Sequence, residues 1–483
     1  MSKTVPNSGS TTYVVERSPS GASQGPISQN AGPIPRLLHH ANGKTVGPGN
    51  QTERPGSVHE LQDLDTNQSL PSPTTAPEAP LQKWNSTPLI MYRTFATFWG
   101  MFIMGMNDAT YGAIIPYLES YYNLSYTIVS LIFLSPLVGY NASALLNNLI
   151  HMRLGQRGVA FLCPAMHITA YVIISQHPPY PSLVIAFMIA GFGNGLEDAA
   201  WNAWIGAMEN ANEVLGFLHA WYGLGATVAP LIATTMITKA GLPWYTWYYC
   251  MIGAAAVEFA TSLSAFWAAS GKVFRDEHPR TSDQTGNRMK EVLFHKPSAR
   301  VTWLAALFLF GYVGVEVGLG GWIVTFMIRV RHGGDFESGM TATGFWLGIT
   351  MGRLVLGFVT PRVGEKLSVA IYLPLAMALE LILWFVPNFA VSAVAVALQG
   401  FFLGPMFPAA VIACTRLLPK HLHVSSIGFA AAFGGSGGAL WPFITGVIAQ
   451  KKGVQVLQPI ILALLACIWM LWLALPRIGK KRD

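Results

Sequence analysis

Residues 153–157, with the sequence Arg-Leu-Gly-Gln-Arg, return as Arg-Val-Gly-Glu-Lys at residues 362–366. Each pentapeptide follows a long apolar run directly, and the two central glycines, Gly155 and Gly364, are 209 positions apart. A glycine between cations is a short motif that many proteins contain by chance. Its return after the same kind of apolar run indicates that the second half of the chain repeats the first.

Other landmarks recur in the same order. Gly191 and Gly195 correspond to Gly400 and Gly404 at the same offset of 209. Further along, the offset becomes 212, which one small insertion explains. The residues matched there are Gly223, Gly225 and Pro230 with Gly435, Gly437 and Pro442. Together these matches predict an internal duplication.

Apolar runs fill the chain from about residue 90, each near the ~20 residues needed to cross ~30 Å of hydrocarbon. We place spans at residues 92–117, 126–149, 158–176, 182–206, 214–238, 245–269, 302–328, 341–360, 367–387, 389–415, 424–448 and 456–476. A long, charged connection at residues 270–301 divides these spans into two groups of six. The predicted fold is therefore an all-α membrane protein of twelve transmembrane helices in two six-helix repeats.

The composition supports a membrane protein. Hydrophobic residues make up 52% of the chain and charged residues 11%, whereas soluble proteins carry about 25% charged residues. Most of the surface therefore does not face water, and a soluble enzyme or nucleic-acid-binding protein is not expected. The four cysteines lie in apolar runs without a C-x-x-C pair, so neither a metal site nor a disulfide framework is predicted.

The polar segments define the remaining organisation. Residues 1–88 are rich in Ser, Pro, Gly, Asn and Thr and lack the apolar core of a signal peptide, which predicts a disordered tail. Two bundles are expected at 89–269 and 302–476, joined by a linker at 270–301 and followed by a tail at 477–483. If both termini are cytosolic, most of the 30 Lys and Arg residues face the cytosol, as the positive-inside rule requires. The plasma membrane is the default location.

Ionisable residues occur inside the predicted spans. Such side chains are costly in a bilayer and normally face a cavity or a partner. They are Asp108, Glu197, Asp198, His219, Glu258, Glu316 and Glu380. The nearest cation, Arg353, lies about two turns from the end of its span, so these carboxylates are expected to lack ion-pair partners. A buried carboxylic acid without a cation is suited to carry a proton.

The six-plus-six repeat resembles the major facilitator transporters, whose substrate site lies near the midplane between the halves. The loop motif of that superfamily is matched by Arg153, Gly155, Arg157, Arg362, Gly364 and Lys366, although Met152 and Pro361 stand where the motif has an acid. In that arrangement, helices 1, 4, 7 and 10 line the cavity. The resemblance thus places Asp108, Glu197 or Asp198, and Glu316 on lining helices. Glu258 and Glu380 fall on outer helices, where a structural role is expected.

Three strings carry a closer resemblance. They are Asn107-Asp108, residues 191–202 (Gly-Phe-Gly-Asn-Gly-Leu-Glu-Asp-Ala-Ala-Trp-Asn) and residues 310–322 (Phe-Gly-Tyr-Val-Gly-Val-Glu-Val-Gly-Leu-Gly-Gly-Trp). They resemble the fucose–proton symporter branch, and its fungal members more closely. That resemblance implies sugar binding and proton coupling at Asp108 and Glu197. Glu316 and Asp198 are further candidates because they lie on lining helices. The candidate substrate-binding residues are Asn107, Asn194, Asn202, Trp201, His219, Tyr222 and Trp322. The bacterial sugar carriers have no acid that matches Glu316, so the resemblance does not fix the sugar.

Several functions fit this sequence. The first is a proton-coupled carrier of a small, sugar-like solute, with the proton gradient as energy source and no cofactor or metal. The second is proton-driven export of a small organic metabolite or drug, although the fifth span lacks the Gly-Pro-x-x-Gly-Gly ending of many antiporters. A nutrient sensor would be expected to have a folded cytosolic extension, and an enzyme is not expected. The expected partners are the solute and the lipid bilayer, and the expected state is a monomer.

Overall fold

The computed structural model describes residues 82–277 and 284–476. The predicted N-terminal tail up to residue 81, the C-terminal tail at 477–483 and residues 278–283 of the predicted linker lie outside the described residues. The secondary structure of the described part consists of α-helices and three short 3-10 turns, without a strand. The all-α prediction is therefore confirmed.

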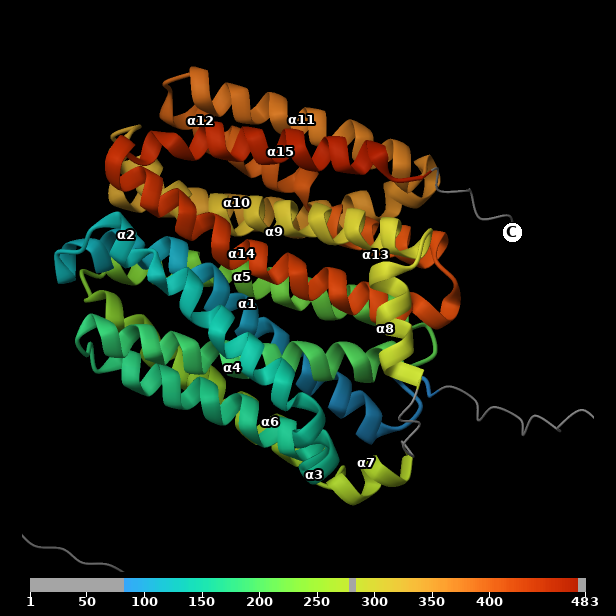
Figure 1. Ribbon diagram of the computed structural model, residues 1–483. Helices are drawn as coiled ribbons and strands as arrows, with labels where there is room; N and C mark the ends of the chain where they lie inside the picture. Colours follow the sequence, from blue (N-terminus) through green and yellow to red (C-terminus); the bar gives the residue numbers. More distant parts are fainter. Residues whose placement is uncertain (1–81, 278–283, 477–483) are drawn as a thin grey trace, which may run out of the picture. The chain divides into compact units, whose positions relative to one another are not determined.

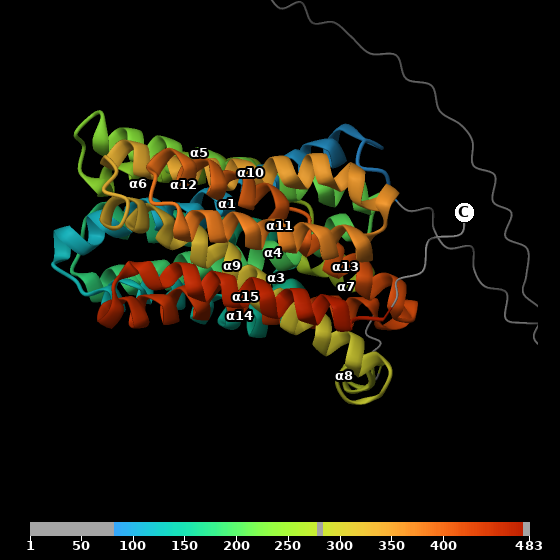
Figure 2. The same cartoon turned by 90° about the horizontal axis from the view of Figure 1, so that it is seen from above.

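The helices fall into two sets separated by the linker (Figure 1). The first set comprises α1 (Pro88–Tyr122), α2 (Tyr126–Val129), α3 (Leu131–Ser175), α4 (Tyr180–Gly206), α5 (Ala211–Thr238) and α6 (Trp247–Phe266). The linker contains α7 (Gly271–Glu277) and α8 (Gln284–Phe294). The second set comprises α9 (Ser298–Arg329), α10 (Asp335–Val363), α11 (Glu365–Phe385), α12 (Phe389–Leu403), α13 (Met406–Leu417), α14 (His423–Lys452) and α15 (Leu457–Ala474). Both linker helices lie at the end of the bundle where α1 begins (Figures 1 and 2).

Local sequence signals set where the helices begin. Thr87 precedes α1 and its hydroxyl accepts a hydrogen bond from the Ile90 N–H at 3.2 Å, while Pro88 occupies the first turn. A capping hydroxyl and an early proline are the ordinary start of a helix, because the first N–H groups have no partner within it. Asn388 caps α12 in the same way through the Val391 N–H at 3.0 Å.

Eleven segments of the described residues are long and apolar enough to cross a membrane. The count is eleven because one segment, residues 126–175, contains two predicted spans. Gly155 interrupts its helical geometry with φ 71° and ψ −165°, a conformation that side chains disfavour. Tyr140 and His167 contact the neighbouring residues Gly195 and Gly193 of α4, so the chain must reverse between them. The described part of the chain therefore has twelve crossings, as predicted.

The predicted tenth span is bent. It consists of α12 and α13, which are separated at Gly404 and Pro405. Proline lacks the N–H that would continue the helix, so a break at this position is expected. Gly404 lies directly against the backbone of Ile349 and Arg353 in α10, where a Cβ atom would be only 2.6 Å from both. The bend therefore presses one lining helix onto its neighbour.

Equivalent contacts in the two halves confirm the repeat. Gly225 of α5 meets the Phe102 carbonyl of α1, and Gly437 of α14 meets the Phe310 carbonyl of α9. A Cβ atom at either glycine would lie 1.9 Å from that oxygen, so only glycine allows the two backbones to approach so closely. The partners, Phe102 and Phe310, are 208 positions apart, which sets the offset for the first helix of each half.

This close approach makes a stability prediction. Gly437→Ala should lower the free energy of unfolding by about 1–3 kcal/mol, because the added carbon forces α14 away from α9. Gly435→Ala is the matched control on the same helix, because a Cβ atom there would meet nothing within 4 Å. Alanine favours a helix over glycine by about 1 kcal/mol, so the control should unfold at the same temperature as the wild type or higher. Thermal unfolding in detergent compares the two, and equal midpoints would contradict the prediction.

The two pentapeptides fasten helix ends within their own halves. The Arg157 N–H donates to the Ala269 carbonyl at 2.9 Å, and its guanidinium lies 5.5 Å from the Trp267 ring. In the second half, Lys366 donates to the carbonyls at the end of α15, and its ammonium lies 5.7 Å from the Trp472 ring. A cation at the carboxyl end of a helix satisfies carbonyls that have no partner and complements the helix dipole. The motif therefore ties the turn between the second and third spans of each half to the end of that half's last helix.

The central helices of the two halves meet near the end at which α1 finishes. A Cβ atom at Gly112 of α1 would lie 2.0 Å from the Gly320 carbonyl of α9. These glycines are 208 positions apart and so occupy equivalent places in the two halves. Nearer the same end, Arg329 of α9 forms an ion pair with Glu119 of α1 at 3.5 Å.

The flanking helices join at the same end. The Tyr126 N–H donates to the Gln450 side chain at 2.8 Å, which connects α2 to α14. The Lys239 ammonium lies 4.2 Å from the Phe336 ring, which connects the end of α5 to the start of α10. Contacts between the halves thus gather toward the end where α1 stops, which we call the Tyr122 end.

Candidate functional site

Asp108 lies at the centre of a polar group formed by three helices of the first half. Its Oδ1 atom accepts hydrogen bonds from the side-chain amides of Asn107 and Asn194, each at 3.1 Å, and Oδ2 accepts one from the Tyr222 hydroxyl at 3.1 Å. Asp108 is partly exposed, and the described residues place no cation in an ion pair with it. Neutral donors therefore hold a carboxylate that solvent can reach.

Asn107 is fixed by two buried tyrosines. Its amide nitrogen lies 2.8 Å from the Tyr111 hydroxyl, and its amide oxygen accepts from the Tyr171 hydroxyl at 3.3 Å. Asn107 is almost fully buried, with 1% of its surface exposed. The Asn107 side chain is therefore held in place and orients the Asp108 carboxylate through their hydrogen bond. Asn107 was predicted to bind the substrate, but in this conformation it is too deeply buried to reach one.

His167 is the principal residue that the sequence-based prediction missed. Its Nδ1 atom lies 3.0 Å from Glu258 Oε2, and its Nε2 atom lies 2.9 Å from Asn194 Oδ1. Because Asn194 also binds Asp108, these hydrogen bonds join Asp108 to Glu258 on the outer helix α6. Glu258 is thus bonded to a side chain of the neighbouring helix α3. A histidine in an apolar span, His167, was the available signal.

Glu197 lies against this group and is buried. One carboxylate oxygen accepts from the Trp201 indole N–H at 2.8 Å, while the other, Oε2, has no hydrogen-bond partner. Atoms of His167, Glu197 and Glu258 all lie within 4.8 Å of one another, and the described residues contain no other group of this kind. Both nitrogens of His167 contact oxygen atoms of the protein, namely those of Glu258 and Asn194.

Asp198 has different surroundings from its neighbour. It is partly exposed, and its carboxylate accepts from the Asn202 amide at 2.7 Å. Adjacent helical residues point about 100° apart, and here that turn separates a buried acid, Glu197, from an exposed one. Only Asp198 of this pair is accessible in this conformation, although the family resemblance assigns the role to Glu197.

The expectation that the buried acids lack ion-pair partners is wrong for Glu316. Arg353 of α10 donates to its carboxylate at 2.8 Å, and both side chains are largely buried. The error arose because Arg353 was placed by its depth in its own span, whereas long side chains reach well beyond their Cα atoms. With the offset of 208 for α1 and α9, Glu316 is the counterpart of Asp108. The two halves thus hold equivalent acids, one paired with a cation and one not.

This ion pair allows a prediction. Arg353→Met should lower the free energy of unfolding by about 3–5 kcal/mol, because it leaves the Glu316 carboxylate buried and unpaired. The double variant Arg353→Met with Glu316→Gln should recover most of that loss, since no charge remains to be paired. Thermal unfolding of the wild type, both single variants (Arg353→Met and Glu316→Gln) and the double variant gives the coupling energy. Equal losses in the single and double variants would show that the pair does not act as a unit.

The remaining predicted substrate-binding residues occupy different places. Trp322 is fully buried, donates to the Pro442 carbonyl at 2.9 Å and packs beside Phe133 at the Tyr122 end. Trp201 is also buried and binds Glu197. His219 is partly exposed and lies near Arg353, with which it interacts electrostatically. Asp108 and Tyr222 are hydrogen-bonded to each other, and Tyr222 and His219 both lie near Arg353 of the other half. Both tryptophans are buried in the protein interior.

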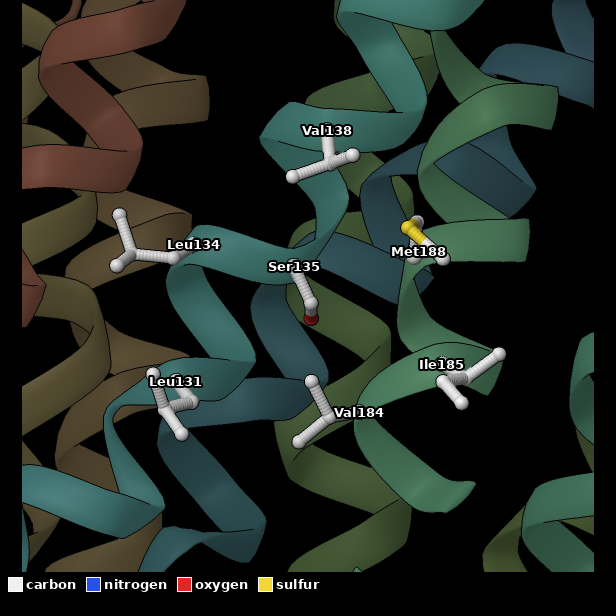
Figure 3. A pocket seen from close by; sticks show the side chains of 7 residues that line it. All are labelled: Leu131, Leu134, Ser135, Val138, Val184, Ile185 and Met188. Carbon is white, nitrogen blue, oxygen red and sulfur yellow. The ribbon is translucent and has the colours of Figure 1, made fainter. Parts of the chain in front are cut away.

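A shallow apolar groove lies apart from this polar group (Figure 3). Side chains of α3 and α4 line it, namely Leu131, Leu134, Ser135, Val138, Val184, Ile185 and Met188. Val138 and Ile185 are more than half exposed, at 56% and 52%. The groove therefore belongs to the apolar outer surface, and it brings no ionisable residue to a solute.

Comparisons with known proteins agree on one family. The family model described as "Major Facilitator Superfamily" matches residues 97–364 and 317–483. "Bypass of stop codon protein 6" of Saccharomyces cerevisiae is 28% identical over 429 residues, which cover 83% of this chain and 85% of that protein. "Glucose/mannose transporter GlcP" of Bacillus subtilis is 22% identical and covers 71% of this chain and 85% of its own length.

A third relative and a solved structure complete the comparison. "Glucose/galactose transporter" of Brucella abortus is 25% identical, covering 75% of this chain and 88% of that protein. The crystal structure of FucP, a Major Facilitator Superfamily transporter in the outward conformation, superposes with a TM-score of 0.57. It covers 80% of this chain and 98% of FucP, at 14% sequence identity. At that identity the superposition supports the fold alone.

Proposed function

Because this chain belongs to the Major Facilitator Superfamily and is an integral membrane transporter, not an enzyme, we propose that it carries a sugar-like solute in symport with protons. Two of the similar proteins are named as transporters of glucose with mannose or galactose. The proton gradient is the proposed energy source, without a cofactor. The proposed location is the plasma membrane, with both termini in the cytosol, as the distribution of Lys and Arg favours.

The observation that carries this proposal is the setting of Asp108. It is partly exposed, it is held by three neutral donors, and one of these, Tyr222, also lies near Glu316 of α9 and Arg353 of α10. A hydroxyl-rich solute between these helices would find both acceptors and donors. Protonation of Asp108 removes a charge from the space between the halves, and that is how a proton would favour movement of the loaded carrier.

The contacts between the halves support alternating access. They gather at the Tyr122 end, where the glycines of α1 and α9 touch and Arg329 pairs with Glu119. With the N-terminus in the cytosol, that end faces outward, and this conformation is closed toward the outside. Separation of these contacts would open the site there, as rocking of one bundle against the other requires.

The test uses purified protein in vesicles that contain a trapped pH dye. A panel of hexoses, pentoses and polyols, including glucose, mannose and galactose, is added without a membrane potential. Acidification inside upon addition of one sugar would establish symport. A folded protein that gives no response across the panel would reject the sugar symport proposal, and export of apolar metabolites under an imposed proton gradient would then be measured.

A further inference from the structure

His167 and Glu258 are buried ionisable residues for which the proposed transport cycle gives no role. Both side chains are essentially inaccessible to solvent, and they lie on the outer helices α3 and α6. They are nevertheless joined to Asp108 by consecutive hydrogen bonds of 3.0, 2.9 and 3.1 Å. The side-chain amide of Asn194 connects His167 to Asp108.

The hydrogen-bond pattern fixes where protons lie. While Asp108 is ionised, it accepts from the Asn194 amide nitrogen, so the amide oxygen faces His167 Nε2. An amide oxygen only accepts, and Nε2 must therefore carry a hydrogen. The contact between Nδ1 and the Glu258 carboxylate then holds one further proton, and with it on Nδ1 the ring is an imidazolium.

Several ionisable groups surround His167. Those that face it are Cys163 and Tyr171 of α3, Glu197 of α4, Glu258 of α6 and, through Asn194, Asp108 of α1. None of these is a cation. Among these described residues, His167 is therefore the group that can supply positive charge near Asp108.

We propose that His167 and Glu258 form an internal proton-holding pair that controls the protonation of Asp108 through Asn194. The proposal rests on the proposed proton coupling at Asp108. An imidazolium behind Asn194 stabilises the ionised form of Asp108 and so promotes release of the transported proton. His167 and Glu258 are thus positioning residues, because neither reaches the solute.

Glu258→Gln is the variant that tests the pair. The glutamine amide would donate to Nδ1 and keep the ring in place with its hydrogen on Nε2, but the ring would be neutral. The pH of half-maximal coupled transport should rise by about 0.5–1 unit, since Asp108 loses a favourable charge. His167→Gln should shift it in the same direction, and the double variant should shift it no further.

Glu380→Gln is the matched control. Glu380 is also fully buried and bonds to an amide, that of Gln399 at 2.9 Å, but in the other half of the molecule. Its pH profile should match the wild type. If Glu258→Gln and Glu380→Gln give the same profile, the pair does not control Asp108 and the inference is wrong.

A second measurement does not need a solute. Infrared difference spectra between two pH values show the carboxylic acid band of Asp108, identified as the band that Asp108→Asn removes. In Glu258→Gln this band should appear at a higher pH than in the wild type, and in Glu380→Gln at the same pH. If the wild type carries sugar without protons while the band still shifts, the proposed function fails and the pair stands. If coupling is present and the band does not shift, the pair fails alone.

Discussion

Asp108→Asn is expected to abolish proton-driven accumulation of solute while leaving exchange of solute across the membrane intact. The asparagine nearly matches the shape of the carboxylate and can keep polar contacts with Asn107, Asn194 and Tyr222, but it cannot take up a proton. With one proton per solute, a gradient of about two pH units supports roughly hundredfold accumulation. The variant should reach equal concentrations on both sides, whatever the gradient.

The measurement is uptake of radiolabelled solute into vesicles with and without a pH gradient, beside exchange at equal pH. Asp198→Asn provides the comparison, because Asp198 is the other partly exposed acid and bonds only within α4, to Asn202. Accumulation by Asp108→Asn would remove Asp108 from the coupling mechanism. Loss of accumulation in Asp198→Asn alone would transfer the role to that residue.

Gly112→Leu is expected to reduce transport at least about a hundredfold by preventing closure of the Tyr122 end. Even a Cβ atom at this position would lie 2.0 Å from the Gly320 carbonyl, and a leucine adds three further carbons. Because the obstacle is backbone, side-chain rotation cannot relieve it. The two halves must separate at this end, and a carrier that cannot close one side cannot complete a cycle.

The state of the Tyr122 end can be measured by labelling. Ser130 is fully buried there and faces Gly446 of the other half, so Ser130→Cys should be protected in the wild-type background. In the Gly112→Leu background it should react with a membrane-impermeant maleimide, after serine replaces the exposed Cys250 and Cys467. Gly357→Leu is the control, because a Cβ atom there meets nothing within 4 Å. Full transport by Gly112→Leu would show that the contact is not a gate.

The sequence was sufficient for the fold because the bilayer leaves few alternatives. Each apolar run must form a helix that satisfies its own hydrogen bonds, and the glycines that recur at an offset of 209 mark the repeat. The contacts of Gly225 and Gly437 then confirm that these matches are structural. The bend at Gly404 and Pro405 was not predicted, since residues 389–415 were placed as one span.

The candidate site was predicted less completely. Asp108 was identified because an acid in an apolar run is rare, and Asp198 and Glu316 for the same reason. The partners could not be identified in this way. Arg353 was seen as a distant cation because depth along one helix says nothing about which helix its side chain faces. His167 was missed although it lies in an apolar span, since its partners Asn194 and Glu258 are far away in sequence.

By itself, the sequence determined the helices, their number, the internal repeat and the rarity of acids within the spans, since these follow from local composition and from the thickness of a membrane. Only the tertiary structure decided which acids share a hydrogen-bond network, which one is paired with a cation, and where the halves touch. Those properties depend on how helices far apart in sequence are rotated against each other. The packing of these helices joins Asp108, Asn194, His167 and Glu258 by consecutive hydrogen bonds.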